Sequence, residues 1–87
     1  MMPRELLTLK EVHVARLVWQ GFTNREIGKD METSEQVIKN HLRSIFDKLG
    51  VWSRLELAMY VASHGGKSWA PESELRVLTG SLNQATG

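Results

Sequence analysis

Residues 23–54 read TNREIGKDMETSEQVIKNHLRSIFDKLGVWSR, and this stretch decides the fold because it holds two helical patterns joined by a short turn. Thr23 and Glu26 form a T-x-x-E capping box that opens a short helix. Ser34 caps a second, longer helix, and Gly50 is a suitable residue to end it. The stretch therefore predicts two consecutive helices connected by a tight turn.

The longer helix, over residues 34–49, has two faces of opposite character. At about 100° per residue, one arc holds only aliphatic residues, namely Ile38, Leu42, Ile45 and Leu49. The opposite arc is polar and charged, with Gln36, Lys39, Asn40, Arg43 and Asp47. A short helix that displays amides and cations in one row, braced by another helix, suits the major groove of DNA.

The distribution of charge supports this interpretation. The chain has 11 Lys and Arg against 10 Asp and Glu, a formal net charge of +1. Between Gln36 and Arg54, however, there are four cations and one acid, so the positive charge is concentrated in this segment. A polar arc is commonly only a solvated helix face, but this concentration of cations favours contact with a polyanion.

Length and composition limit the classes of protein. Eighty-seven residues make one small domain, near the lower end of what folds alone, and a dimer would add stability. The absence of cysteine excludes disulfides and cysteine-based metal or redox sites. No apolar run approaches the roughly 20 residues that a membrane span needs, and the N-terminus is too short and too charged for a signal peptide. We therefore expect a cytoplasmic protein with no membrane partner.

The sequence shows no catalytic or cofactor-binding pattern. No Ser/His/Asp set, paired carboxylates or glycine-rich phosphate loop is present. His41 shows no metal-ligand spacing to His13 or His64. We expect no catalytic residue, no metal, no cofactor and no small-molecule ligand, and hence a protein that is not an enzyme.

Two further helices flank the central stretch. Thr8 and Glu11 form another capping box, and the helix that they open is expected to stop at Gly21. Ser53 caps a fourth helix that is expected to end near His64. No strand pattern is found, so the chain is predicted to be all-α.

The fourth helix has apolar residues on two opposite sides. One stripe comprises Leu55, Ala58, Met59 and Ala62, and the other comprises Leu57, Tyr60 and Val61. A domain of this size can bury only one side in its own core, so the other needs a partner chain or the C-terminal tail. The pattern does not decide which side is which. We assign a homodimer interface to Leu57, Tyr60, Val61 and His64, with coverage by the tail as the alternative.

A change in character after Gly65 suggests a domain over residues 1–65 and a C-terminal extension over residues 66–87. In the extension, Pro71 at a first helical position, followed by Glu72 and Glu74, favours a short helix.

Taken together, these runs resemble the LuxR/FixJ (GerE-type) helix-turn-helix family. The matching residues are Leu7, Thr8 and Glu11; Gly21, Thr23, Asn24, Glu26 and Ile27; Ser34 and Glu35; Lys39–Arg43; Ile45, Phe46 and Lys48–Val51; and Ser53, Arg54 and Ala58. The resemblance implies a bacterial transcription regulator with a tri-helical core and a fourth, dimerisation helix. Its third helix would enter the major groove of double-stranded promoter or operator DNA.

Candidate contacts divide into base-reading and backbone-positioning residues. The base-reading candidates are Gln36, Lys39, Asn40 and Arg43. Lysine and arginine suit the acceptors of guanine, and asparagine suits adenine; by position in the family motif, Lys39 and Arg43 are favoured. The backbone candidates are Thr23, Asn24, Arg25, Ser34, Val37, Lys48 and Arg54. For Thr23 and Ser34, helix capping alone is a sufficient explanation.

Several residues depart from the family pattern. Val37 stands where the family usually has a threonine whose hydroxyl reaches a phosphate, and valine has no hydroxyl for that contact. Val12, Trp19 and Trp52 occupy positions that are commonly polar. They are either scattered surface hydrophobes or a contact site for a partner chain or for the tail, through Trp69, Leu75 and Leu78.

Three functions remain open at this stage. The leading one is a sequence-specific DNA-binding transcription regulator that acts as a homodimer and is associated with the nucleoid when bound. The alternative is a protein-interaction module that forms heterodimers with other regulators and sequesters them, through the fourth helix and exposed tryptophans. A sigma-factor-like promoter-recognition domain is a third option, which fits the run from Lys48 to Val51 poorly.

Overall fold

A computed structural model describes residues 6–69 of the chain. It consists of α1 (Leu9–Trp19), α2 (Asn24–Asp30), α3 (Glu35–Leu49), α4 (Arg54–Ser63) and the short 3-10 helix η2 (Gly66–Ser68). No strand occurs within residues 6–69. The predicted all-α, four-helix fold is therefore confirmed. The helix expected after Pro71 lies outside the described residues.

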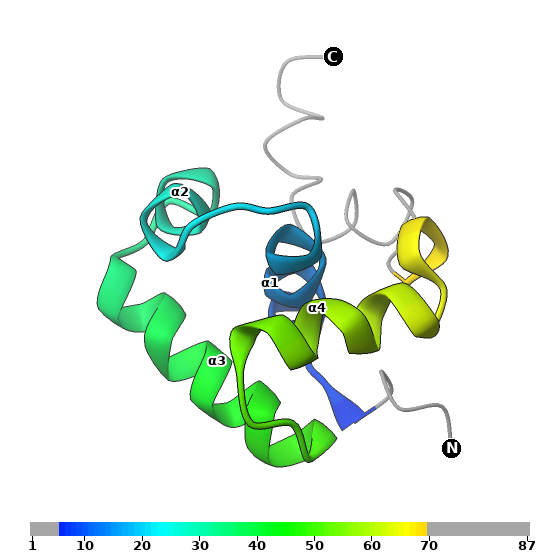
Figure 1. Cartoon of the computed structure of the whole chain (residues 1–87). Helices are drawn as coiled ribbons and strands as arrows, with labels where there is room; N and C mark the ends of the chain where they lie inside the picture. The colour runs from blue at the N-terminus through cyan, green and yellow to red at the C-terminus, as the bar shows by residue number, and fades with distance from the viewer. Residues whose placement is uncertain (1–5, 70–87) are drawn as a thin grey trace.

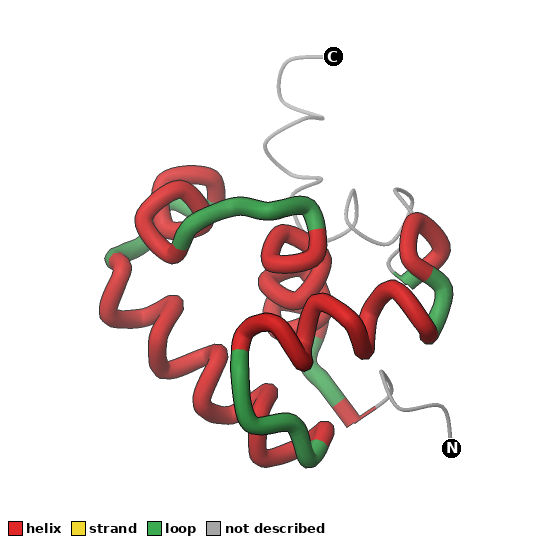
Figure 2. The backbone as a smooth tube through the Cα atoms, viewed as in Figure 1, coloured by secondary structure: helices red, strands yellow, loops and turns green. Residues whose placement is uncertain are grey.

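Helix α1 is the centre of the arrangement (Figure 1). Helices α3 and α4 both pack against α1, and α2 packs against α3. The tube in Figure 2 shows the short connection that turns the chain from α2 into α3. Helix η2 follows the end of α4 that lies farthest from α3 (Figure 1). Among residues 6–69, one surface of α3 is thus left without a neighbouring helix.

All four helices begin at the residues predicted from the sequence. Thr8 and Thr23 each accept a hydrogen bond from the backbone amide three residues on, and complete capping boxes with Glu11 and Glu26. The Ser34 hydroxyl accepts from Val37 N, at 3.2 Å. These side chains satisfy backbone amides that have no partner within their own helix, which is why local sequence specified the starts so well.

The turn between α2 and α3 depends on Gly28. A Cβ added to this glycine would lie 3.0 Å from the backbone oxygen of Thr33. The amide of Thr33 also donates to the Gly28 carbonyl, at 2.8 Å. The low helix propensity of glycine is tolerated here because the backbone approaches so closely. This turn therefore fixes the angle between α2 and α3.

The hydrophobic core draws on all four helices. Its fully buried aliphatic side chains are Val14, Ile27, Ile38, Ile45, Leu57 and Val61. Ile38 and Ile45 come from the apolar arc predicted for α3, so that arc faces the core as expected. The opposite, polar arc consequently faces solvent.

Two of the residues assigned to a dimer interface were assigned wrongly. Leu57 and Val61 are completely buried in this structure, because α4 packs that stripe against α1. Tyr60 is half-buried and stacks on His64, with ring centroids 4.0 Å apart. The other stripe of α4 is the exposed one: Leu55 is 69% and Met59 is 61% exposed.

The segment after α4 folds back onto α1. The Trp69 side chain is only 1% exposed, and its indole N–H donates to the Val12 carbonyl at 3.2 Å. Gly66 lies against the ring of Trp19. Val12 itself is buried, so it is not a surface hydrophobe. Of the tail residues proposed to cover this part of α1, Trp69 does so, while Leu75 and Leu78 lie outside residues 6–69.

Candidate nucleic-acid interface

The polar arc of α3 forms one exposed surface, which we call the cationic face of α3. Its members are the four base-reading candidates, all exposed: Gln36, Lys39, Asn40 and Arg43. The core packing of Ile38, Leu42 and Ile45 on the other side of the helix prevents this face from turning inward. The structure thus brings together the four side chains that the sequence singled out.

Interactions within the cationic face leave its charges accessible. The Gln36 side-chain amide donates to Asn40 Oδ1 at 3.2 Å. Lys39 Nζ lies 3.8 Å from the Glu35 carboxylate, an exposed pair one helical turn apart. Arg43 makes no ion pair or side-chain hydrogen bond with any residue between 6 and 69. Exposed pairs of this kind contribute little energy, so both cations can be redirected to a ligand.

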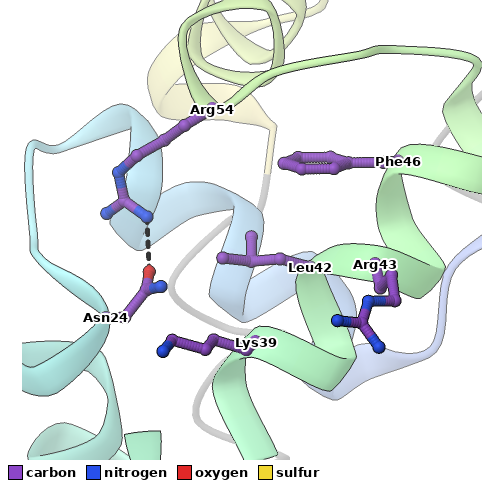
Figure 3. Close-up of a pocket in the computed structure, with 6 residues that line it drawn as sticks. All are labelled: Asn24, Lys39, Leu42, Arg43, Phe46 and Arg54. Carbon is purple, nitrogen blue, oxygen red and sulfur yellow. Dashed lines mark hydrogen bonds between the residues drawn. The ribbon is translucent and has the colours of Figure 1, made fainter. Parts of the chain in front are cut away.

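An open hollow of about 350 Å³ lies beside this face. Figure 3 shows its lining residues, contributed by α2, α3 and the start of α4: Asn24, Lys39, Leu42, Arg43, Phe46 and Arg54. Leu42 and Phe46 are apolar, and three of the other four carry a positive charge. The hollow therefore brings three cations together around an apolar floor, a lining that suits an anionic group.

Arg54, predicted to contact the DNA backbone, is bonded inside the domain. Its guanidinium donates to the side-chain oxygen of Asn24 (Figure 3) and to the backbone carbonyl of Phe22. Burial lowers the pKa of Arg54 from its ordinary value, but arginine stays protonated at neutral pH. Asn24, another backbone candidate, is the partner of this arginine.

Lys48, a further backbone candidate, also has a partner within the domain. Its Nζ lies 2.7 Å from Glu11 Oε1, and the Glu11 side chain is only 5% exposed. Burial opposes ionisation of Glu11, but hydrogen bonds from Lys48, Thr8 and Ser44 outweigh it, and the pKa of Glu11 is lowered. The sequence showed the capping role of Glu11 but gave no sign of this long-range pair.

The remaining backbone candidates lie at or near the start of α2 and α3. Thr23 and Ser34 are the N-caps described above, and hydrogen bonds from Thr23 lower the pKa of Glu26. Arg25 and Val37 are exposed. Of the residues at these two helix starts, Asn24 lines the hollow beside Lys39 and Arg43, and the free backbone amides of a helix N-terminus favour a phosphate.

A second exposed surface, which we call the apolar face of α4, lies along that helix and the loop before it. It consists of Leu55, Met59 and Trp52, and the last is 89% exposed. Leu55 and Met59 are four residues apart and so lie on one side of α4, while Trp52 belongs to the loop that leads into the helix. Large apolar side chains grouped on a surface mark a contact with another molecule more often than isolated ones do.

No metal or membrane element is found within the part of the chain that the structure describes. Among residues 6–69, no group of three potential ligand side chains could hold a metal ion. His13 on α1 is paired instead with Asp30 on α2, at 3.1 Å. No helix in residues 6–69 combines the length and hydropathy required to traverse a lipid bilayer.

Comparison with known proteins gives consistent results. ComA of Bacillus subtilis (strain 168), a transcriptional regulatory protein, is 43% identical over 63 residues, which cover 72% of this chain and 27% of ComA. LiaR, another transcriptional regulatory protein of B. subtilis, is 36% identical over 59 residues, covering 68% of this chain and 28% of LiaR. AlkS of Pseudomonas putida, an HTH-type transcriptional regulator, is 39% identical over 61 residues, covering 70% and 7%.

The chain thus spans less than a third of the length of these relatives. No solved structure matches it significantly. The sequence pattern of the bacterial regulatory proteins of the luxR family matches residues 5–61, which include α1 to α3 and most of α4. The chain, with four helices in the order that the family resemblance implied, belongs to the luxR family of bacterial regulatory proteins.

Proposed function

We propose that this chain is a sequence-specific DNA-binding domain of a transcription regulator, and that α3 reads the major groove. The observation that carries the proposal is the cationic face of α3, which is exposed and braced from behind by the core. The named roles of its relatives as transcriptional regulators support the proposal. Such a domain has no catalytic role, and it acts in the cytoplasm, where bacterial promoter DNA lies.

The base-reading roles follow from donor and acceptor chemistry. Arg43 and Lys39 are assigned to the O6 and N7 acceptors of guanine. The Gln36–Asn40 pair can exchange its mutual hydrogen bond, 3.2 Å in the free protein, for bonds to an adenine edge. Arg25 and the amino ends of α2 and α3, at Thr23 and Ser34, are assigned to phosphates.

We further propose that the domain forms a homodimer through the apolar face of α4. Burial of Trp52, Leu55 and Met59 against a second copy would remove the largest exposed apolar side chains of α4 and its leading loop from water. A two-fold dimer would place two α3 helices about 34 Å apart, one turn of DNA. This surface replaces the earlier assignment to Leu57 and Val61, while His64 and Tyr60 lie toward the other end of α4.

Selection from a random-oligonucleotide library, followed by binding titrations, tests the DNA-binding proposal. We expect a defined motif, and a loss of about tenfold to a hundredfold in affinity for Arg43→Ala, the range for one good base contact. Lys67→Ala, in η2 at the far end of α4, removes the same charge and serves as the control. If no motif emerges and Lys67→Ala weakens binding as much as Arg43→Ala, DNA contact is non-specific and the proposal is wrong.

One observation also favours the alternative function, a module that pairs with other regulators. The apolar face of α4 is as suited to a related chain as to a second copy. Trp52 is the tryptophan available for this, because Trp69 is buried. A stable complex with a luxR-family relative, together with no DNA binding by the chain at low salt, would establish the sequestering role instead.

A further inference from the structure

Arg54 occupies a position where a cation is unfavourable. It is the first residue of α4, and Ser53 already caps this helix by accepting from Glu56 N. The amino end of a helix carries partial positive charge, so an arginine there is repelled by the helix dipole. The two hydrogen bonds of the Arg54 side chain inside the domain offset that repulsion.

Those two bonds join parts of the fold that have little other direct contact. The helix pairs that pack extensively are α1 with α4, α1 with α3 and α2 with α3. Arg54 spans from the start of α4 to the start of α2, at Asn24, and to the loop before it, at Phe22. Figure 3 shows the guanidinium directed toward Asn24.

We propose that Arg54 is a positioning residue that fixes α4 relative to the reading unit α2–α3, and so sets the spacing between half-sites. The inference rests on the proposed function, since α4 is taken as the dimer helix and α3 as the reading helix. A rotation of α4 against α2–α3 would change the distance between the two reading helices of a dimer. Arg54 restrains that rotation through two acceptors at once, because the planar guanidinium holds its donors in a fixed geometry, whereas the donors of a lysine ammonium rotate freely on a flexible stem.

Arg54 itself is not assigned to a phosphate. Its guanidinium is already partly desolvated, as its lowered pKa indicates, and two of its N–H groups are engaged. Lys39 and Arg43 line the same hollow without any such internal bonds from their own charged groups to α2. The charge that meets a phosphate there comes from α3.

The test compares wild type with Arg54→Ala and Arg54→Lys on the selected DNA motif, with half-sites separated by a series of spacings. We expect wild type to prefer one spacing, and both variants to bind several spacings with similar affinity. The slope of log affinity against log salt should stay at the wild-type value in both. The affinity of a single protomer for DNA that holds only one half-site should also be unchanged. Arg25→Ala, an exposed arginine on α2 assigned to a phosphate, is the matched control and should lower the slope.

If Arg54 instead contacts a phosphate, its substitution should change the salt dependence of binding. Each lost phosphate contact reduces the salt slope by about 0.9. If Arg54→Ala lowers the slope by that amount, keeps the spacing preference and is rescued by Arg54→Lys, then Arg54 is a phosphate contact and the inference is wrong. Asn24→Ala removes only one of the two acceptors of Arg54, and it provides a second test of the positioning role if Arg54→Ala does not fold. This variant should bind a broader range of half-site spacings than wild type. An unchanged spacing preference would count against the inference. If wild type itself selects no motif, the proposed function fails instead.

Discussion

At the level of single residues, Lys48 was expected to contact the DNA backbone, but in the structure it forms an ion pair with Glu11 inside the domain. The two residues are 37 positions apart in the chain, and their charged atoms lie 2.7 Å apart in the fold. Glu11 also accepts from the Thr8 amide, at 2.9 Å, as part of the capping box. The carboxylate therefore joins the start of α1 to the end of α3.

Replacing Lys48 by methionine should destabilise the domain while leaving DNA affinity nearly unchanged. Loss of the partner of a buried charge costs about 3–5 kcal/mol; because Lys48 is itself about a third exposed, we expect roughly 2 kcal/mol. Urea denaturation at pH 7 measures this free energy of unfolding. The double variant Glu11→Gln/Lys48→Met should recover part of it. Unchanged stability with weakened DNA binding would identify Lys48 as a phosphate contact.

The lowered pKa of Glu11 predicts a dependence of stability on pH. Because the folded state holds this pKa below the ordinary value of 4.5, the carboxylate contributes stability above pH 4.5. That contribution is lost as the pH falls through the folded-state pKa. Glu11→Gln should therefore be less stable than wild type at neutral pH, and the difference should narrow in acid. Denaturation curves collected from pH 7 to pH 3 measure the difference in unfolding free energy between the variant and wild type. A difference that stays constant over this range would contradict the role assigned to the Glu11 carboxylate.

At the scale of helices, local sequence predicted where each one begins and which face of α3 is polar. A cap and its partner amide are three residues apart, so this information is entirely local. The orientation of α4 was not local: two apolar stripes on opposite sides fit equally well to α1 or to a partner. Only packing against α1 shows that Leu57 and Val61 belong to the core. The role of Trp69 was hidden for the same reason, since its hydrogen-bond partner is 57 residues away.

Gly28→Ala should destabilise the connection between α2 and α3. Alanine has the higher helix propensity, by about 1 kcal/mol. Its Cβ would, however, lie 3.0 Å from the Thr33 carbonyl oxygen, which is backbone and cannot move without displacing the turn. We expect a net loss of about 1 kcal/mol or more in unfolding free energy, read from chemical denaturation. Stabilisation by this substitution would show that the turn relaxes freely. Lys29→Ala, at an exposed position of α2, is the control.

Trp69→Ala should be among the most destabilising single changes outside the four helices. The side chain is fully buried against α1 and lies edge-on to Tyr60, with ring centroids 6.1 Å apart. Truncating a buried tryptophan costs about 3–5 kcal/mol. Thermal denaturation would measure the loss, with Ser68→Ala as a control at an exposed neighbour. A melting temperature equal to wild type would mean that residues 66–69 do not belong to the folded domain. The expected result includes residues 66–69 in the folded domain, beyond the boundary after residue 65 that the sequence suggested.

At the scale of the whole molecule, the two faces have separate tasks. The cationic face of α3 and the apolar face of α4 are carried by different helices, and Arg54 connects the units that bear them.

Met59→Glu should prevent self-association, since it puts a charge into the apolar face of α4. It should leave the stability of the domain unchanged, because Met59 is already 61% exposed. Sedimentation equilibrium measures the effect, and Ser63→Glu near the end of α4 is the control. A wild-type chain that is monomeric at all concentrations would contradict the dimer proposal.

Contact between the cationic face of α3 and DNA can be observed residue by residue, through chemical-shift mapping on the isotope-labelled chain. On addition of the selected duplex, we predict that the largest changes fall on Gln36, Lys39, Asn40 and Arg43, and on the amino ends of α2 and α3. Core residues such as Ile45 should change little. Shifts that cluster on α4 and η2, with the signals of those four residues unchanged, would show that DNA does not bind to the cationic face of α3.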